Sequence, residues 1–186
     1  MQELIGFGYW RSLYEPTLPD PEWFVDTHWA AATRQAVVNY LQQGYPLRHF
    51  MGYSWCRFRC GTASGAMGTA DLTDGTYCWP EGLRHYLLKH AVRLPEPLVQ
   101  HILAQTAFPH SKAAQTPPAS HATLTWWATQ VGWHPARSSF LSESDEEVRT
   151  YVRRFDQGKL DFSDYSAEGI QAIKRMVLQL RDVNIS

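Results

Sequence analysis

Hydrophobic residues recur at helical spacing in three stretches of this chain, and each stretch predicts an amphipathic helix. The first stretch covers about 27–43. The second follows Ser144 and Glu147, which match a capping box, and the third covers about 167–182. The apolar faces are formed, in chain order, by Trp29, Thr33, Val37, Tyr40 and Leu41, then Val148, Tyr151, Val152 and Phe155, then Ile170, Ile173, Val177 and Leu180.

The middle of the chain has the residue types of a small β element. Met51, Trp55 and Phe58 suggest β structure that the following glycines interrupt, and a further strand is expected around the turn Asp74-Gly75. Helices before and after this region, with strands between them, predict an α+β fold. We expect this fold to be mostly helical.

Prolines indicate where helices cannot run and where they can begin. Pro16, Pro19 and Pro21 exclude a helix from the opening segment, which we expect to lie extended across the body of the protein. Pro80 stands where a helix can start, and Glu81 is favourably placed in its first turn.

The stretch 108–120 has the composition of a linker, because its small residues and paired prolines give it little to bury. A short helix is expected before it, over 96–105, and Ser120 could cap a helix after it. We therefore expect an N-terminal α+β domain over 1–107 and a C-terminal helical part over 121–186, which could also pack together as one domain.

The amino-acid composition disfavours several classes of function. Seventeen basic and eighteen acidic residues give a net charge of −1, which does not favour nucleic-acid or membrane binding. Three cysteines are an odd and small number, so a reducing cytoplasm is expected rather than a disulfide scaffold, and no secretion signal is recognisable. The eight tryptophans and nine tyrosines predict either a core of large rings or a binding surface.

All three cysteines lie close together in the chain, and two histidines follow them. Cys56 and Cys60 are separated by three residues, and His85 and His90 by four. Structural zinc takes four thiolate or imidazole ligands in a tetrahedron, and both gaps fall within the usual range for such sites. The sequence therefore predicts a zinc site with these four ligands, which could form a ββα zinc unit.

Two features of this ligand set leave alternatives open. His85 and His90 are five positions apart, so on an ideal helix they point roughly 140° away from each other, at ~100° per residue. The helix would have to tighten, or end near His90. Cys78 could replace one ligand, and a metal-free role for the cysteines in the core is the other alternative.

Two other kinds of chemistry are considered. A small hydrolase could use a cysteine or a metal, but a Cys-His nucleophile pair needs a thiol of lowered pKa and a third, orienting group, which sequence does not reveal. A zinc-finger-type helix could contact nucleic acid through nearby basic residues. These are Arg57, Arg59, Arg84, Lys89 and Arg93.

Residues 56–95 also resemble a set of small bacterial proteins with the pattern C-R-x-C-G, then D-G-x-Y-x-W-P-E-G-L-x-H-Y, then H-x-V-x-L-P. The match departs at the first motif, where C-R-F-R-C has one residue more. The resemblance implies a bacterial origin, and it favours treating the two cysteines and two histidines as one group. The matching residues are Cys56, Arg57, Cys60, Gly61, Asp74, Gly75, Tyr77, Trp79, Pro80, Glu81, Gly82, Leu83, His85, Tyr86, His90, Val92, Leu94 and Pro95.

No complete catalytic set is recognisable, so the leading hypothesis is a non-enzymatic, cytoplasmic protein that binds another protein. An immunity or inhibitor protein directed at a toxin or effector, or an adaptor, would fit a small, charge-balanced, tryptophan-rich chain. Exposed aromatic residues and the acidic stretch 143–147 are the expected contacts. A nucleic-acid binder and a small hydrolase are the alternatives.

Overall fold

The computed structural model divides the chain into two compact units, Met1–Trp10 with Leu18–Arg137, and Arg11–Thr17 with Ser138–Ser186. The capping box at Ser144, the acidic stretch 143–147 and the apolar stripe of the last predicted helix lie outside the residues that the structure describes. The described residues are 3–11, 15, 17–52, 54–58, 60–63, 65–105, 107–117, 120–133, 153–159 and 174.

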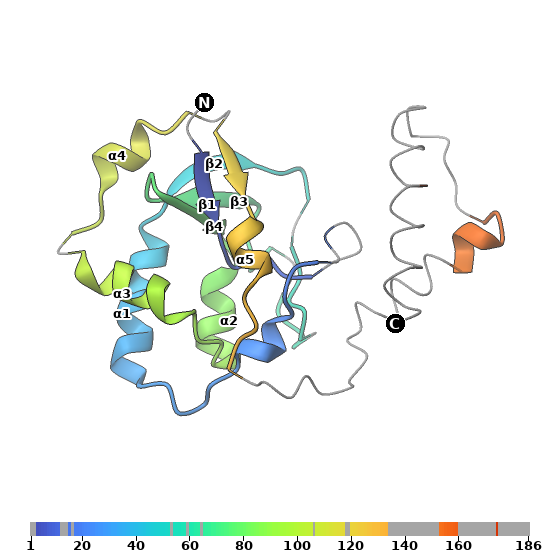
Figure 1. Ribbon diagram of the computed structural model, residues 1–186, viewed down its shortest axis with the longest axis horizontal. Coiled ribbons are helices and arrows are strands. Elements are labelled where there is room, and N and C mark those ends of the chain that lie inside the picture. The colour runs from blue at the N-terminus through green and yellow to red at the C-terminus, as the bar shows by residue number, and fades with distance from the viewer. Residues whose placement is uncertain are drawn as a thin grey trace. The chain divides into compact units, whose positions relative to one another are not determined.

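A five-stranded mixed sheet, in the order β2-β3-β4-β1-β5, forms the centre of the first unit (Figure 1). β2, β3 and β4 are antiparallel neighbours, whereas β1 runs parallel to both β4 and β5. The strands are β1 (Glu3–Gly6), β2 (Tyr45–His49), β3 (Ala70–Thr73), β4 (Tyr77–Pro80) and β5 (His121–Thr123).

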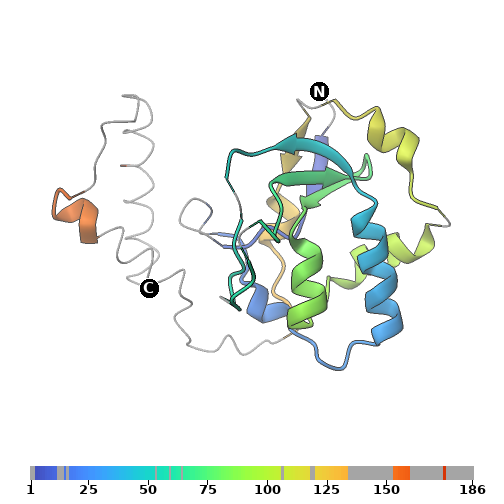
Figure 2. The same cartoon turned by 180° about the vertical axis from the view of Figure 1, so that it is seen from behind.

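Helices complete the unit, and α1 contacts both α2 and α3 below the sheet as drawn from behind (Figure 2). The helices are η1 (Pro21–Phe24), α1 (Ala31–Gln42), α2 (Leu83–His90), α3 (Glu96–Ala104), α4 (His110–Ala114) and α5 (Thr125–Ala128). The predicted α+β class is confirmed. The expected predominance of helix is not confirmed, because helices account for 36% of the described residues and strands for 17%.

The aromatic richness of the chain is largely explained by its core. Trp79 and Trp127 are almost completely buried, and the Trp127 ring stacks on Phe24 at a centroid distance of 5.2 Å. Buried indoles need a partner for their N–H group. Trp79 Nε1 donates to the carbonyl oxygen of Leu41 at the end of α1 (3.3 Å), which ties this helix to β4.

The turn between β3 and β4 lies at Asp74-Gly75, as the sequence predicted, and the structure shows that the Asp74 side chain holds it. Its Oδ1 accepts hydrogen bonds from the backbone amides of Thr76 and Tyr77, both at 2.7 Å. Its Oδ2 accepts a bond from the Tyr40 hydroxyl (2.9 Å) and lies 3.1 Å from His101 Nε2. Asp74 is buried, and the carboxylate therefore joins the hairpin turn to α1 and α3.

Three expectations for the first half of the chain need correction. Met51, Trp55 and Phe58 do not form β structure, because the strand of this region, β2, ends before them at His49. The opening segment does not simply lie extended across the body, because Glu3–Gly6 is an inner strand of the sheet. Four residues are too few for the periodicity of a strand to be recognised with assurance. Pro80 ends β4 rather than starting a helix, and α2 begins at Leu83.

The expected linker over 108–120 is also wrong. Within it, α4 forms at His110–Ala114, and the side chains of Phe108 and Ala113 are buried in the core. Ser120 caps no helix, because β5 follows it and pairs with β1, and the helix expected after the linker forms later, as the short α5. The first unit therefore continues well past the boundary that we placed at 107, because small residues and a phenylalanine close its core here.

Candidate metal centre

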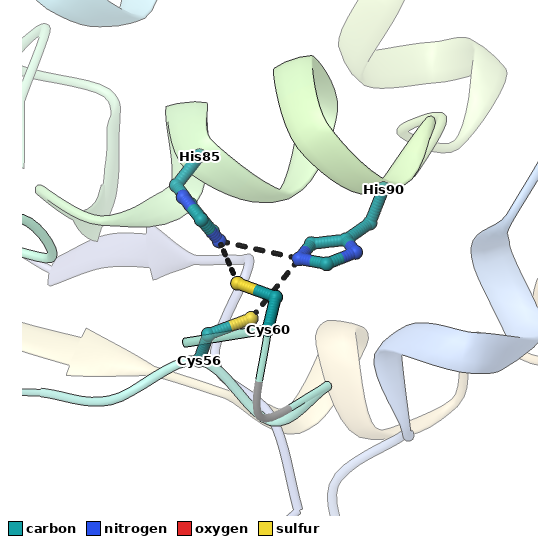
Figure 3. Close-up of side chains that lie close together, drawn as sticks. All are labelled: Cys56, Cys60, His85 and His90. Carbon is teal, nitrogen blue, oxygen red and sulfur yellow. Dashed lines mark hydrogen bonds between the residues drawn. The ribbon is translucent and has the colours of Figure 1, made fainter. Parts of the chain in front are cut away.

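Four side chains that the sequence grouped together converge in the structure (Figure 3). Cys56 and Cys60 come from the loop between β2 and β3, and His85 and His90 come from α2. One ligand atom from each residue lies within 4.8 Å of all the others. Among the described residues, this is the group of cysteine, histidine or acidic side chains that could hold a metal ion.

The cluster differs in one respect from the ββα unit that the spacing suggested. The hairpin of β3 and β4 followed by α2 is present, and α2 supplies both histidines. Both cysteines, however, precede this hairpin and do not lie on it. The β3–β4 hairpin lies between Cys60 and His85. The interval between the cysteine pair and the histidine pair is therefore longer than in an ordinary zinc finger.

The distances between the ligand atoms resemble the edges of a zinc tetrahedron. Zn–N bonds of ~2.0–2.1 Å and Zn–S bonds of ~2.3 Å give N···N edges of ~3.3 Å and N···S edges of ~3.6 Å. In the structure, the Nε2 atoms of His85 and His90 are 3.2 Å apart. Cys56 Sγ lies 3.2 Å from His90 Nε2, and Cys60 Sγ lies 3.4 Å from His85 Nε2.

The end of α2 solves the angular problem that the two histidines posed. The helix stops at His90, and Ala91 adopts the left-handed conformation with φ 51°. The backbone amide of Val92 then donates to the carbonyl oxygen of Tyr86 (3.2 Å), which closes the helix. His90 is thus the last helical residue, and its ring lies close to that of His85. Of the two possibilities that the spacing left open, a tightened helix or a helix that ends near His90, the structure has the second.

Ala91 offers a test of this helix end. A residue with a Cβ atom is disfavoured in the left-handed region by about 1–2 kcal/mol, and glycine is not. We expect Ala91→Gly to raise the free energy of unfolding by about 0.5–1 kcal/mol, after the greater entropy of glycine in the unfolded chain is subtracted. The midpoint of urea unfolding measures this change.

Ala36→Gly is the matched control for Ala91→Gly. Ala36 is exposed within α1, where glycine costs about 1 kcal/mol. The two substitutions remove the same methyl group, and we expect them to shift the urea midpoint in opposite directions. A destabilised Ala91→Gly variant would contradict the proposed strain at this helix end.

The cysteine loop is fastened to α2 by Tyr86. The backbone amide of Arg57 donates to the Tyr86 hydroxyl (3.0 Å), and this hydroxyl donates to the carbonyl oxygen of Trp55 (3.5 Å). The Phe58 ring stacks on His90 with a centroid distance of 4.1 Å and an interplanar angle of 14°. These contacts fix the orientation of the loop and of one imidazole ring, which is how residues around a metal site orient its ligands.

The surroundings favour the neutral form of both imidazoles, which is the form that binds metals. Burial lowers the pKa of His85, and the charge of Lys89 lowers it further. Burial lowers the pKa of His90, and His85 contributes in the same direction. Neither ring is therefore expected to be positively charged at neutral pH.

The two thiols differ in their surroundings. Burial raises the pKa of Cys56, although the backbone amides of Phe58 and Cys60 act in the opposite direction. The Thr62 hydroxyl, 2.9 Å from Cys60 Sγ, lowers the pKa of the exposed Cys60 thiol. A metal ion binds the thiolate form of both, so its binding would release their protons.

Cys78 lies apart from this cluster. It stands in β4, where its side chain is fully buried with Leu4 and Leu47, and burial raises the pKa of its thiol to about 11. The Tyr9 hydroxyl is 3.6 Å from its sulfur. The structure thus assembles four ligand atoms without the alternative ligand that we considered, and Cys78 has the packing role that is common for a free cysteine.

Sequence reasoning did not identify the residues that support the centre. Tyr86, Phe58 and Thr62 have no spacing that distinguishes them from ordinary core or loop residues, and only their three-dimensional positions connect them to the ligands. It also missed the contact between His101 and Asp74, since the two residues are far apart in the chain. His49, His110 and His121 are not part of the ligand group.

Comparisons with protein-family models, with curated proteins and with solved structures found no match to this chain. In the part of the chain that the structure describes, no helix has both the length and the apolar character to cross a membrane.

Proposed function

We propose that this protein is a non-enzymatic protein-binding module whose Cys56, Cys60, His85 and His90 side chains hold a structural zinc ion. The observation that carries the proposal is the convergence of two thiols and two imidazoles, from separate segments, at distances close to those of a zinc tetrahedron. Zinc is the metal that best suits two sulfur and two nitrogen ligands in this geometry.

The number of ligands favours a structural over a hydrolytic role. Catalytic zinc sites use three protein ligands and leave a fourth position for water, whereas structural sites are closed by four. A thiol–imidazole pair is the other reading of the Cys60 to His85 distance. That reading uses one cysteine and one histidine, and it gives no role to the second pair, Cys56 Sγ and His90 Nε2 at 3.2 Å.

Zinc would hold the long β2–β3 loop against α2. The described backbone hydrogen bonds across the base of this loop are few: Phe50 N to Thr69 O (2.8 Å) and Ser54 N to Gly68 O (3.5 Å). A metal ion bound by both cysteines would add a strong anchor to the contacts that already join this loop to α2 through Tyr86 and Phe58. A loop fixed in this way can present side chains to a partner at a low entropic cost.

A bacterial cytoplasmic immunity, inhibitor or adaptor protein is the role that we propose for such a module. The support is a chain of near-neutral charge with no assembled catalytic set among its described residues, and with exposed aromatic side chains beside the metal centre. A nucleic-acid-binding role is the alternative, and salt-sensitive binding of a poly(dT) strand would support it.

Chelation tests the structural role of zinc. After zinc removal with a strong chelator, we expect amide hydrogen exchange to accelerate over 50–69 and over the last turn of α2, because these segments lose their shared anchor. β1 and α3 lack metal ligands and should be much less affected. Readdition of zinc should restore protection, and exchange that is unchanged by the chelator would argue against a structural zinc ion.

A further inference from the structure

The loop that carries the cysteines has three exposed large apolar side chains within one six-residue segment, 50–55. Phe50 is 52% exposed, Trp55 is 72% exposed, and Met51 is completely exposed. We call these three residues, together with Arg57, the loop surface. Large apolar side chains are ordinarily buried, and a group of them on one short segment indicates a contact site.

The backbone brings these residues together in space. The backbone amide of Phe50 donates a hydrogen bond to the carbonyl oxygen of Thr69, and that of Ser54 donates one to the carbonyl oxygen of the neighbouring Gly68. Because Gly68 and Thr69 are adjacent, Phe50 and Ser54 both lie against the same short part of the chain, and Met51 stands between them in sequence. Trp55 follows Ser54 directly, so the three exposed apolar side chains come from one short segment.

The charge around the loop surface is positive. No acidic residue occurs between Tyr45 and Ala70 in the sequence. The nearest carboxylates are already engaged, since Asp71 is buried and paired with Arg48 (2.7 Å), and Glu81 accepts hydrogen bonds from the amides of Thr69 and Ala70.

Three cationic side chains belong to this region. The Arg48 guanidinium lies 5.7 Å from the centre of the Phe50 ring, and Asp71 balances its charge, so the positive charge comes from Arg57 and Lys89. Within the described part of the chain, Arg57 and Lys89 form no ion pair. A zinc ion bound by two thiolates would have no net charge, so it would leave this positive balance unchanged.

We propose that the loop surface docks a partner protein that offers an apolar pocket bordered by carboxylates. This inference rests on the proposed function, because the zinc ion fixes the loop. Tryptophan, phenylalanine, methionine and arginine are the residues enriched at the centre of protein interfaces, and the loop surface consists of these types. The surrounding cations supply the charge complementarity for an acidic border.

The small number of positive charges near the loop surface favours a protein partner over a nucleic acid. Nucleic-acid binding without sequence preference uses a basic groove with many phosphate contacts. The loop surface has one arginine, with Arg48 and Lys89 nearby, on a chain of net charge −1. This number of positive charges is sufficient for contacts with a few carboxylates around a protein pocket, and it is too small for the many phosphate contacts of a nucleic-acid groove.

The test is selection from a phage-displayed library of random dodecapeptides on the zinc-loaded protein. We expect the selected peptides to combine aromatic or aliphatic residues with an excess of Asp and Glu. A synthetic peptide of the consensus sequence should bind more weakly at high salt, because exposed ion pairs are screened. The affinity is measured by fluorescence polarisation or calorimetry.

Two variants separate the apolar from the charged contribution. Trp55→Ala should weaken peptide binding at least about 10-fold, which corresponds to a hot-spot residue. Arg57→Glu should weaken binding about 5-fold or more and reduce its salt dependence. Both changes keep the backbone contacts with Tyr86, so the loop should remain attached. Leu103→Ala, at an exposed leucine on α3, is the control that should leave affinity unchanged.

Three outcomes would contradict the docking proposal. The library could yield no binding peptide, the selected peptides could lack an excess of acidic residues, or Trp55→Ala could leave the affinity unchanged. Binding of a 15-nucleotide poly(dT) strand that Trp55→Ala abolishes would assign the surface to nucleic acid instead. Zinc content is measured for every variant, so that loss of the metal, which would refute the proposed function, is distinguished from loss of docking alone.

Discussion

Cys56→Ser is expected to weaken zinc binding by about 100-fold or more. Structural zinc sites of this type contribute about 10–16 kcal/mol at neutral pH, so each of four ligands accounts for roughly 3 kcal/mol. At saturating zinc, a loss of this size should lower the midpoint of thermal unfolding by about 10 °C in a domain of this length. Competition with a chromogenic zinc chelator measures the affinity, and calorimetry measures the unfolding midpoint.

Cys78→Ala is the matched control for Cys56→Ser. Both variants remove one buried thiol, but Cys78 lies in β4 with Leu4 and Leu47, away from the cluster. We expect this control to bind zinc with unchanged affinity and to lose about 1 kcal/mol of stability from the small cavity. Loss of zinc in Cys78→Ala, with retention in Cys56→Ser, would show that the ligand set is wrong.

Asp74→Ala should destabilise the protein by about 3–5 kcal/mol. The buried carboxylate accepts bonds from the amides of Thr76 and Tyr77 and from the Tyr40 hydroxyl, and it contacts His101. Alanine would leave these buried donors without an acceptor, and each one costs about 1–3 kcal/mol. Denaturant unfolding, monitored by far-UV circular dichroism, measures the change.

Tyr40→Phe is the control that isolates one of these contacts. It removes only the hydroxyl that reaches Asp74 Oδ2, so we expect a loss of about 1–2 kcal/mol. Zinc affinity should be nearly unchanged in both variants when they are folded, because neither residue contacts the cysteines or histidines of the centre. A loss for Asp74→Ala no larger than that for Tyr40→Phe would contradict the role of this carboxylate in the turn.

The candidate ligand set was predictable because it depends on residue type and local spacing. Two cysteines on one short turn, and two histidines on one short helix, can each be recognised from the chain alone. The decision between Cys78 and the other cysteines was not predictable in the same way. It depends on β4 directing Cys78 toward Leu4 and Leu47, which are distant in sequence.

The helices with long apolar stripes were predicted better than the strands. α1 forms close to the expected position, because its apolar periodicity extends over several turns, and the short helix expected over 96–105 is α3. β1 and β5 were missed, since four and three residues respectively carry little periodic signal and both strands depend on pairing with distant segments. The linker prediction is wrong because small residues do not by themselves indicate exposure, and Ala113 is buried in the core.

X-ray absorption spectroscopy on the purified protein, combined with elemental analysis, tests the central claim most directly. We predict one zinc ion per chain, with two sulfur neighbours at ~2.3 Å and two nitrogen neighbours at ~2.0–2.1 Å. Cys56→Ser should lose one sulfur neighbour or the metal itself. A protein that binds no zinc when supplied with it, or zinc with no sulfur neighbour, would contradict the account.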